Sequence, residues 1–396
     1  MKRFDAVVIG AGPAGATAAI VLARAGLEVA VVEKAAYPRR KVCGEFISAT
    51  TWPLLRELGV AAGLEAVAGP PVQRVGLFAA DVVVDAPMPQ PGAGEAWGRA
   101  VGREHLDTAL LEAAVRAGAT LYQPMSALAV EEHAGGCRVT LGEREGRTQA
   151  IEARAVVAAH GSWEVGSLPS HPAPLRHGAC DLLGFKAHFT GTHLAPGLMP
   201  LVLFPGGYGG MVHADGGRTS FSCCVRRDAL GRCRRSHRGL AAGEALLLHI
   251  AESCRGVREA LAGARREAAW LSAGPIRPGV RSPAHGRIFR VGNLAGEAHP
   301  LVAEGISMAI QSGWLVSRAL AAQALDDAGL AVARARYARE WKAHFARRVR
   351  ASSVFAVLTT SRATAAASVA AVGGAPSILT WGARASGKAH GLAEVA

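Results

Sequence analysis

Three glycines at a fixed spacing near the N-terminus could hold a phosphate group. The run from Gly10 to Gly15, GAGPAG, fits the pattern G-x-G-x-x-G. In this pattern the first glycine allows a tight turn, and the second lets the backbone approach a pyrophosphate. The third lets the following helix lie close on the sheet. The pattern therefore predicts a pyrophosphate site that involves Gly10, Gly12, Ala14 and Gly15.

An acidic residue follows at the distance that a nucleoside site requires. Glu33 lies 21 positions after Gly12, at the end of the segment EVAVVE. A carboxylate at this position accepts both hydroxyls of an adenosine ribose and repels a 2′-phosphate. Glu33 is therefore expected to bind the ribose of a dinucleotide.

The elements that would position these residues can be read from the same stretch. Residues 4–10 form a β-branched apolar run typical of a buried parallel strand, residues 14–25 favour a helix that ends at Gly26, and residues 28–33 favour a second strand. Lys2-Arg3 before an apolar stretch also resembles a secretory signal. Asp5, three glycines and a proline inside that stretch argue against a signal peptide.

Composition indicates a globular protein of two packed domains. The chain has 396 residues, of which half are apolar and 19% are charged. Seven cysteines without a C-x-x-C pair indicate reduced thiols in the cytoplasm and no metal site. Cys223 and Cys224 lie in a strand-like run, which predicts packing on opposite faces.

The net charge does not indicate a nucleic-acid partner. Of the formal +13, a large part comes from residues 334–350, which contain seven basic residues and one acidic residue. A local excess of this kind argues against a broad nucleic-acid surface. No run of about 20 uncharged apolar residues occurs, so a spanning helix is not expected.

A basic loop after Glu33 carries the first resemblance to a known family. The run from Arg39 to Glu45, RRKVCGE, follows the dinucleotide fold. In this it resembles the FAD-dependent geranylgeranyl reductase group of the para-hydroxybenzoate hydroxylase superfamily. The resemblance implies FAD as the cofactor, Arg40 and Lys41 as its phosphate contacts, and Cys43 and Glu45 as residues near the isoalloxazine or the substrate. If the resemblance to the family is left out, a solvated basic turn with a half-buried thiol explains this run equally well.

Two later elements resemble the same superfamily. Arg103 begins a run, REHLD, that is similar to R-x-x-L/F-D, and the resemblance implies that Arg103 contacts FAD. The alternative is that Arg103 pairs with Glu104 and Asp107. Residues 292–307 resemble G-D-A-A-G-x-x-x-P-x-x-G-E-G, which implies that the helix start at Gly305 and Ile306 faces the flavin. A helix N-terminus stabilises the anion of a reduced flavin.

Three departures from the superfamily bear on the reaction. Asn293 stands where an aspartate usually binds ribityl hydroxyls, although an amide can still donate and accept. His160 replaces the acid of an Asp-Gly pair that hydroxylases associate with reaction by a nicotinamide. The W-x-W-x-I-P run of flavin halogenases is absent, so the sequence does not favour halogenation as the activity. By contrast, residues 206–210, GGYGG, resemble the glycine-aromatic strand of prenyl reductases.

The expected fold is α/β, with two domains interleaved along the chain and a helical C-terminus. A Rossmann-like FAD-binding domain is predicted over residues 1–70, 96–168 and 280–330. Short alternating segments between residues 181 and 225 predict an antiparallel sheet, which would form the wall of a site for a bulky apolar substrate. The substrate domain is accordingly predicted over residues 71–95 and 169–279, and a helical region over residues 331–396.

An apolar stripe in the C-terminal region has two interpretations. Tyr337, Trp341, Phe345 and Val349 recur every four residues on a helix whose other faces are basic. Such a stripe packs on the body of its own protein, or it lies on an anionic membrane through residues 334–350. The second interpretation would make the protein cytoplasmic but peripheral to a membrane.

Three functions follow from these observations. The leading hypothesis is a flavin monooxygenase that hydroxylates an apolar aromatic, polyketide-like or lipid molecule, with NAD(P)H as electron donor. The alternative is a prenyl-type reductase that saturates carbon–carbon double bonds, which the KVCGE loop and the Gly-Tyr-Gly strand favour. A third hypothesis, of another class, is an FAD-binding accessory protein that acts through a partner, although no obligate protein partner is evident in the sequence.

Overall fold

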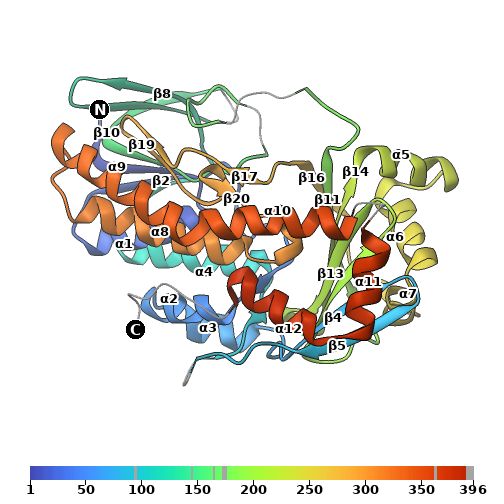
Figure 1. The fold of residues 1–396 in the computed structure, drawn as a ribbon. Helices are drawn as coiled ribbons and strands as arrows, with labels where there is room; N and C mark the ends of the chain where they lie inside the picture. The colour runs from blue at the N-terminus through green and yellow to red at the C-terminus, as the bar shows by residue number, and fades with distance from the viewer. Residues whose placement is uncertain (93–95, 144–145, 164–165, 172–175, 361–363, 389–396) are drawn as a thin grey trace.

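Two eight-stranded sheets with their covering helices make up most of the protein (Figure 1). The computed structural model describes residues 1–92, 96–143, 146–163, 166–171, 176–360 and 364–388. The chain passes between the two sheets several times, because the strands of the second sheet come from two separate stretches of sequence. The predicted α/β class, with interleaved sheets and a helical C-terminus, is confirmed. The exact domain boundaries remain a prediction.

The first sheet is the parallel sheet that the N-terminal pattern predicted. Its central strand β1 pairs in parallel with β10 on one side and β2 on the other, so that Val7 faces Val156 and Ala30. These β-branched and alanine runs are buried on both faces, as parallel strands require. The strands of this sheet are β1 (Arg3–Ile9), β2 (Val29–Val32), β7 (Thr120–Tyr122), β8 (Ser126–His133), β9 (Gly136–Gly142), β10 (Thr148–Ala158), β18 (Ala284–His285) and β19 (Ile288–Arg290).

Three helices cover one face of this sheet and pack closely on one another. They are α1 (Pro13–Arg24), α4 (Arg103–Arg116) and α8 (Gly305–Ala321). The approach of α1 and α8 depends on Gly313, where a Cβ would lie 2.3 Å from the carbonyl oxygen of Ala14. Two shorter helices, α2 (Trp52–Glu57) and α3 (Ala61–Val67), contribute to the same apolar core.

The second sheet has the strand order β15-β11-β14-β13-β12-β4-β5, and β16 also pairs with β11. It differs from the prediction in one respect, because β4 and β12 are parallel and not antiparallel. This pair joins two distant segments by a long crossover, which local alternation does not reveal. The strands are β4 (Arg74–Ala79), β5 (Val82–Pro87), β11 (Leu182–Thr190), β12 (Leu198–Phe204), β13 (Gly207–His213), β14 (Thr219–Arg226), β15 (Arg265–Arg266) and β16 (Leu271–Ile276).

Short elements complete the two sheet units. Helices α5 (Arg227–Ser236), α6 (Ala242–Ser253) and α7 (Arg255–Ala260) pack on one face of the second sheet through a separate apolar core. Two small pairs, β3 (Phe46–Ile47) with β6 (Arg99–Ala100) and β17 (Gly279–Val280) with β20 (Gly296–Glu297), lie outside both sheets. Single 3-10 turns occur at Ala49–Thr51, Asp215–Gly217, Gly292–Leu294 and Pro300–Val302.

The C-terminal helices cross from one sheet unit to the other. Figure 1 shows α10 running across the front of the molecule, with α11 and α12 folding back beneath it. A π-helical turn at Lys342–Ala346 joins α9 to α10, and another at Arg384–Lys388 follows α12. The helices are α9 (Asp327–Trp341), α10 (Arg347–Thr360), α11 (Ala365–Gly374) and α12 (Ser377–Ala383).

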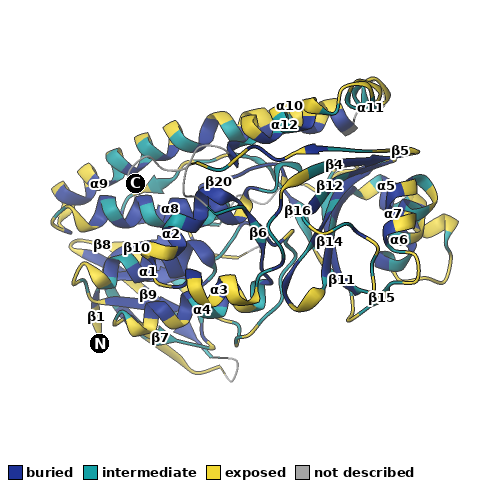
Figure 2. Cartoon of the chain, turned by 90° about the horizontal axis from the view of Figure 1, so that it is seen from below, coloured by how far each residue is buried: buried dark blue, intermediate teal, exposed yellow. Residues whose placement is uncertain are grey.

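The apolar stripe of this region packs inside the protein. Tyr337, Trp341, Phe345 and Val349 are all buried and belong to the core that also contains α1 and α8. Figure 2 shows the same burial on the inner side of α9 and α10. The packing interpretation of the stripe is therefore confirmed. A membrane contact through residues 334–350 stays a prediction, and it would depend on the basic side chains alone.

Candidate functional site

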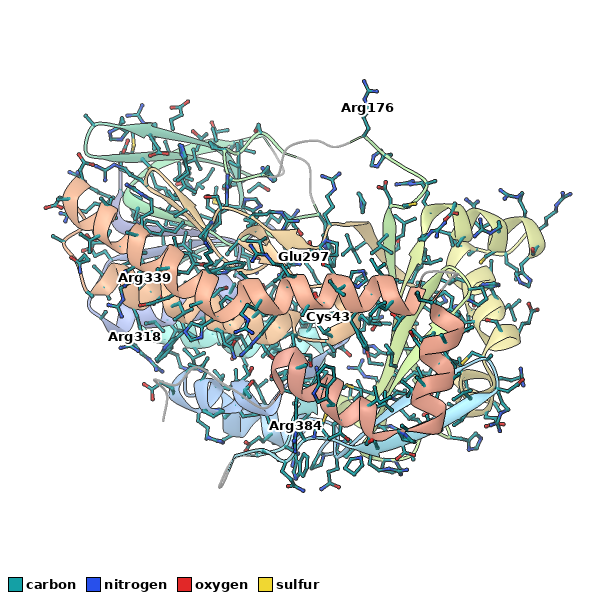
Figure 3. All side chains as sticks on the ribbon, in the orientation of Figure 1. Cys43, Arg176, Glu297, Arg318, Arg339 and Arg384 are labelled. Carbon is teal, nitrogen blue, oxygen red and sulfur yellow. The ribbon has the colours of Figure 1, made fainter. Side chains whose placement is uncertain are left out.

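A cavity of about 990 Å³ lies between the two sheets. Its volume is at the upper end of the range for small-molecule sites in proteins, which is about 300–1,000 Å³. One end is formed by the glycine-rich turn after β1, and the other by β12, β13, α10 and α12. Figure 3 places Cys43 and Glu297 in the middle of the molecule, behind and next to α10.

The glycine-rich turn has the geometry that its pattern predicts. Gly10 has a φ of +100°, and a Cβ at this position would lie 2.7 Å from the carbonyl oxygen of Ala159. At Gly15 a Cβ would lie 1.9 Å from the carbonyl oxygen of Gly10. Gly12 is the N-cap of α1 and borders the cavity, whereas Gly15 serves the packing of α1 on β1. The turn therefore needs glycine at both ends and leaves the start of α1 open to a ligand.

Glu33 lies at the end of β2, on the wall of the cavity, and is buried. Its Oε2 atom accepts a hydrogen bond of 2.9 Å from the backbone N–H of Ala11, and Oε1 accepts one of 2.9 Å from Ala35. A carboxylate has about four lone-pair sites, so it retains acceptors for two ribose hydroxyls. This geometry fits the role that its position predicts.

The basic loop presents Arg39, and not Arg40, at the glycine-rich turn. Nη2 of Arg39 donates to the Tyr37 hydroxyl at 2.9 Å and lies 4.0 Å from the position of a Cβ on Gly12. Within the described residues, the buried Nε and Nη1 atoms of Arg39 have no hydrogen-bond partner. Such unpaired donors beside a helix N-terminus fit a pyrophosphate.

Arg40 has a different position from the one predicted for it. Its Nη2 atom lies 3.1 Å from Nδ1 of His188 on β11. Arg39 borders the cavity, whereas Arg40 is not among the described residues that line it. Lys41, the other predicted phosphate contact, does border the cavity. The structure therefore places Arg39, and not Arg40, beside the other predicted phosphate contacts, and a phosphate-binding role for either arginine stays a prediction.

Arg103 pairs with Asp107, which was part of the alternative interpretation, and its contact with FAD stays a prediction. Its Nε and Nη2 atoms each donate to the Asp107 carboxylate at 2.7 Å. Nη2 also lies 3.8 Å from the position of a Cβ on Gly12. Asp107 therefore orients the guanidinium toward the predicted pyrophosphate position. Glu104, the other proposed partner, binds Arg218 at 3.0 Å.

The second predicted cofactor element meets the first, although the two are almost 280 residues apart. Gly292 has a φ of +58°, and a Cβ there would lie 3.2 Å from Cβ of Ala14. Its backbone N–H donates to Ser312 of α8 at 2.8 Å. Asn293, Gly305 and Ile306 all border the cavity near this point, so the N-terminus of α8 opens onto it.

These observations together test whether FAD fits the residues present. The open start of α1, the unpaired donors of Arg39 and the Glu33 carboxylate suit the adenosine diphosphate half. Asn293 and the start of α8 suit the ribityl chain and the flavin ring. The residues therefore fit FAD along one continuous wall of the cavity.

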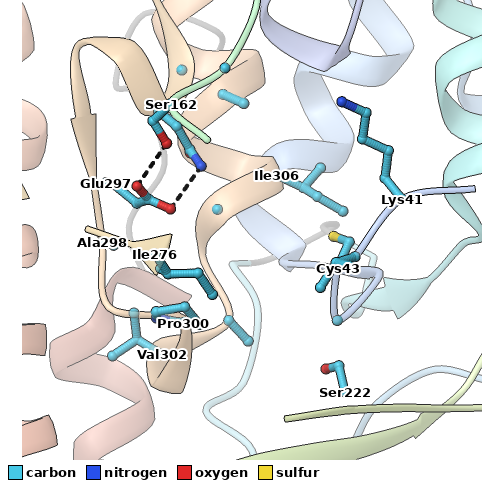
Figure 4. A pocket seen from close by; sticks show the side chains of 18 of the residues that line it. Lys41, Cys43, Ser162, Ser222, Ile276, Glu297, Ala298, Pro300, Val302 and Ile306 are labelled. Carbon is cyan, nitrogen blue, oxygen red and sulfur yellow. Dashed lines mark hydrogen bonds between the residues drawn. The ribbon is translucent and has the colours of Figure 1, made fainter. Parts of the chain in front are cut away.

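Glu297 is a buried carboxyl group of the cavity that the sequence did not single out. Its Oε2 atom accepts from Ser162 Oγ at 2.9 Å, and Oε1 accepts from Asn293 Nδ2 at 3.1 Å (Figure 4). Burial raises the pKa of Glu297 above its usual value, even though the hydrogen bonds from Ser162 and Trp163 oppose the shift. Glu297 occupies a position of the motif at which any residue is allowed, so the sequence pattern does not identify it. Only its burial in the structure does.

Cys43 borders the cavity and is partly exposed. Figure 4 shows its thiol between Ile306 at the start of α8 and Ser222 of β14. Its Sγ atom accepts the backbone N–H of Glu45 at 3.4 Å. Cys43 therefore lies between the start of α8 and the second sheet, and its place near the isoalloxazine or the substrate stays a prediction.

Glu45 holds this loop in place by a buried ionic cluster. Its carboxylate binds Nζ of Lys186, and it accepts from Nε2 of His188 at 2.7 Å. All three side chains are fully buried. Burial alone would raise the pKa of Glu45, but the His188 hydrogen bond and the Lys186 charge lower it to about 2.

The cluster changes the predicted role of Glu45. Its carboxylate is committed to two side chains of β11, Lys186 and His188, so we interpret it as an anchor for the loop that carries Cys43 and not as a free acid. The positive φ of Glu45, +65°, shows that the anchor holds an unfavourable backbone conformation. Lys186 and His188 were not identified in the sequence, where their only signal is that they lie on the same face of one strand.

The adjacent cysteines of β14 lie on opposite faces, as predicted. Cys223 belongs to the core formed with α5–α7, and Cys224 to a core that contains Tyr208 and Leu379. All seven cysteines are free thiols. Among the described residues, no group of histidines, cysteines and acids is arranged to hold a metal ion, and no helix is long and apolar enough to cross a membrane.

Replacing Arg39 with alanine is expected to weaken FAD binding by roughly 10–100-fold. Hydrogen bonds to charged groups contribute about 1.5–3 kcal/mol each, and a factor of ten corresponds to about 1.4 kcal/mol. Titration of the apoprotein with FAD, followed by flavin fluorescence, measures the change. Arg40→Ala is the matched control and should bind FAD like the wild type. Equal losses in both variants would contradict the assignment of Arg39.

Comparison with known proteins supports this description of the site. Residues 3–170 match the family described as FAD binding domain. A menaquinone reductase of Mycolicibacterium smegmatis is 40% identical over 30% of this chain, and the match spans only 28% of that relative. A digeranylgeranylglycerophospholipid reductase of Methanopyrus kandleri is 27% identical over 90% of this chain and 88% of its own length. The structure of a myxobacterial chondrochloren halogenase, described as FAD-dependent, superimposes with a TM-score of 0.72 at 20% identity, over 96% of this chain and 98% of that one.

Residues 3–170 therefore match an FAD-binding domain family, and the whole chain shares the fold of an FAD-dependent enzyme. The chain is similar to the geranylgeranyl reductase-like proteins, as its sequence motifs predicted. The prediction of an FAD-binding domain is thereby confirmed, whereas NAD(P)H as electron donor stays a prediction. Similarity to the halogenase shows a shared fold alone.

Proposed function

We propose that this protein is an FAD-dependent reductase that saturates carbon–carbon double bonds in a long apolar molecule of prenyl type. One observation carries the proposal: the KVCGE loop and the Gly-Tyr-Gly strand, which resemble prenyl reductases, line the same cavity as the flavin elements. The names of the two reductase relatives support the same class of substrate.

The part of the cavity beyond Cys43 suits an extended hydrocarbon. Strands β12, β13 and β16 and helix α12 line it with aliphatic and sulfur-containing side chains, among them Met199, Leu201, Met211, Ile276 and Leu379. Apolar walls of this kind select a substrate by its shape and volume. Burial of the substrate against them is favourable by roughly 25 cal/mol per Å² of apolar surface. A prenyl chain offers the apolar area that such walls need.

The reaction requires a hydride at one carbon of the double bond and a proton at the other. Bound and reduced, FAD supplies the hydride, and we propose NAD(P)H as the reductant that regenerates it. The chain itself must supply the proton and exclude water. Cys43 and Glu297 are two protic groups of the cavity wall, and the raised pKa of Glu297 keeps its carboxyl protonated to higher pH than usual. Solvent then returns the proton to the donor.

A flavin monooxygenase is the second candidate function. The Arg103 and 292–307 elements favour it, because both resemble the hydroxylase superfamily and both border the cavity. His160 counts against it: this residue lies where hydroxylases carry an acid, and its Nε2 atom is 2.7 Å from Ser170 Oγ. An accessory flavoprotein that serves a partner through its basic C-terminal helices is the third candidate.

A reoxidation assay without oxygen tests the reductase proposal. The holoprotein is reduced by light under nitrogen and then mixed with a menaquinone that has an unsaturated prenyl side chain. The proposal expects substrate-dependent return of the oxidised flavin spectrum and a more saturated side chain in the product. Reoxidation that occurs only after air is admitted would favour the monooxygenase, and flavin that no small molecule reoxidises would favour the accessory protein.

Replacing Cys43 with alanine should leave FAD bound but slow turnover. A positioned proton donor typically contributes about 10²–10⁴-fold to a rate, so a decrease within that range is expected if the thiol donates the proton. Turnover and flavin content are measured on the same preparation. Glu297→Gln is the comparison variant, because the amide keeps its size but cannot deliver a proton. Loss of flavin from Cys43→Ala would instead make the loop a cofactor clamp.

A further inference from the structure

The largest exposed apolar side chains of the C-terminal region gather on two helices. Val354 and Val357 of α10 are 62% and 65% exposed, and Trp381 of α12 is 70% exposed. Phe355, Leu358 and Ile378 on the same two helices are exposed as well. Exposed apolar clusters of this kind are uncommon on monomeric proteins and mark sites of interaction. We call these six residues the apolar rim.

The apolar rim surrounds the opening of the cavity. Five of its six residues, all except Val357, line the cavity while they are also exposed to solvent. A side chain with both properties lies at a mouth. Figure 2 shows exposed residues along the outer side of α10 and α12, opposite the buried face that packs on the protein. A molecule that enters here meets apolar surface before it meets the flavin elements.

Basic residues continue the same face of α10. Arg347, Arg350, Val354 and Val357 follow one another at spacings of three or four residues, which places them on one side of a helix. Arg347 and Arg350 are exposed, and so is Arg384 after α12 (Figure 3). From Trp341 to Lys388 the sequence contains no aspartate or glutamate. The face is therefore both apolar and uniformly positive.

From these observations we propose that the apolar rim and its arginines dock the protein on an anionic lipid bilayer, with the cavity mouth facing the lipid. Each part has a physical reason. Tryptophan favours the membrane interface, apolar side chains enter the acyl boundary, and each arginine near an anionic surface adds to the attraction. Only Arg347 and Arg350 of this contact fall within residues 334–350, whose apolar stripe is buried, and the six residues of the apolar rim all lie further along the chain. It does not depend on which reaction the flavin performs.

Vesicle flotation tests the proposal with the 396-residue chain and its bound FAD. Vesicles of phosphatidylcholine with phosphatidylglycerol should bind the wild type, and binding should decrease as salt increases. Val357→Asp, which changes an exposed rim residue outside the cavity lining, and the double variant Arg347→Glu/Arg350→Glu should each bind at least tenfold more weakly, roughly as expected for the lost attraction. Circular dichroism establishes that the variants are folded.

Matched controls separate this face from general effects of charge. Val332→Asp on α9 changes a valine that is 52% exposed, and Arg234→Glu on α5 changes an exposed arginine distant in sequence. Both should bind vesicles like the wild type. Absence of binding at low salt, or equal losses in the controls, would overturn the proposal. So would a dimer in sedimentation that Val357→Asp dissociates, because the rim would then be an interface between two copies.

Discussion

Replacing Lys186 with methionine is expected to lower the free energy of unfolding by about 3–5 kcal/mol. Glu45, Lys186 and His188 form a fully buried cluster, so removing one cation leaves a carboxylate with too little compensation in a medium that solvates it poorly. Urea denaturation followed by far-UV circular dichroism measures the loss. Because Glu45 anchors the loop that carries Cys43, the variant should also show a shifted flavin spectrum.

The pH dependence of stability is an independent test of the same cluster. The pKa of Glu45 is lowered from 4.5 to about 2 in the folded protein, so its stabilisation is complete above pH 4.5 and is lost as the pH falls toward 2. Lys186→Met should raise the folded pKa and shift acid unfolding to higher pH. Adding Glu45→Gln to Lys186→Met should recover part of the stability, because an amide leaves no uncompensated charge.

A surface ion pair serves as the control for this prediction. Arg255 and Glu259 are 3.4 Å apart and largely exposed, so Arg255→Met should cost at most about 1 kcal/mol. If Lys186→Met were no more costly than Arg255→Met, or if the double variant were less stable than the single one, the cluster would not be the anchor described above.

Gly15→Ala is expected to abolish FAD binding and to destabilise the fold. The new Cβ would lie 1.9 Å from the carbonyl oxygen of Gly10 and 2.8 Å from Cβ of Ala159. Neither contact is with a flexible side chain, so α1 would have to move away from β1. Overpacking of a core costs typically about 1–3 kcal/mol and occasionally more. Displacing α1 also moves the turn at Gly12, whose backbone must approach the pyrophosphate.

The matched control is Gly63→Ala in α3. A Cβ on Gly63 meets no atom within 4 Å among the described residues. Alanine restricts the unfolded chain and favours a helix, so stability should stay the same or rise by about 0.4–1 kcal/mol. Thermal unfolding and flavin content are measured for both variants. A Gly15→Ala protein that retains FAD like the wild type would contradict the close packing of α1 on β1.

The sequence predicts the nucleotide end of the site well because its signals are local. The strand, the glycine-rich turn, the helix and Glu33 lie within 33 residues, and periodicity and turn chemistry determine each of them. The later element at residues 292–307 was also predicted, because its motif is contiguous. Its approach to Ala14 could be expected only through the resemblance to a known family.

The parts that were missed depend on contacts between distant segments. The choice between Arg39 and Arg40 is made by the direction of an irregular loop, which packs Arg40 against His188 nearly 150 residues later. Lys186 belongs to a strand that alternation describes as core, so its pairing with Glu45 is invisible locally. The parallel pairing of β4 with β12 and the buried position of Glu297 were missed for the same reason, because each depends on contacts between distant segments.

The central claim is that reduced FAD in this cavity saturates a double bond, and the mass of the product tests it most directly. Photoreduced holoprotein is incubated under nitrogen with a menaquinone that has an unsaturated prenyl side chain, and the extracted lipid is analysed by mass spectrometry. After the extract is reoxidised so that every ring is again a quinone, we predict a product whose side chain is heavier by two hydrogen atoms, formed without oxygen and diminished in Cys43→Ala. A product that forms only in air and carries one added oxygen atom would contradict the account.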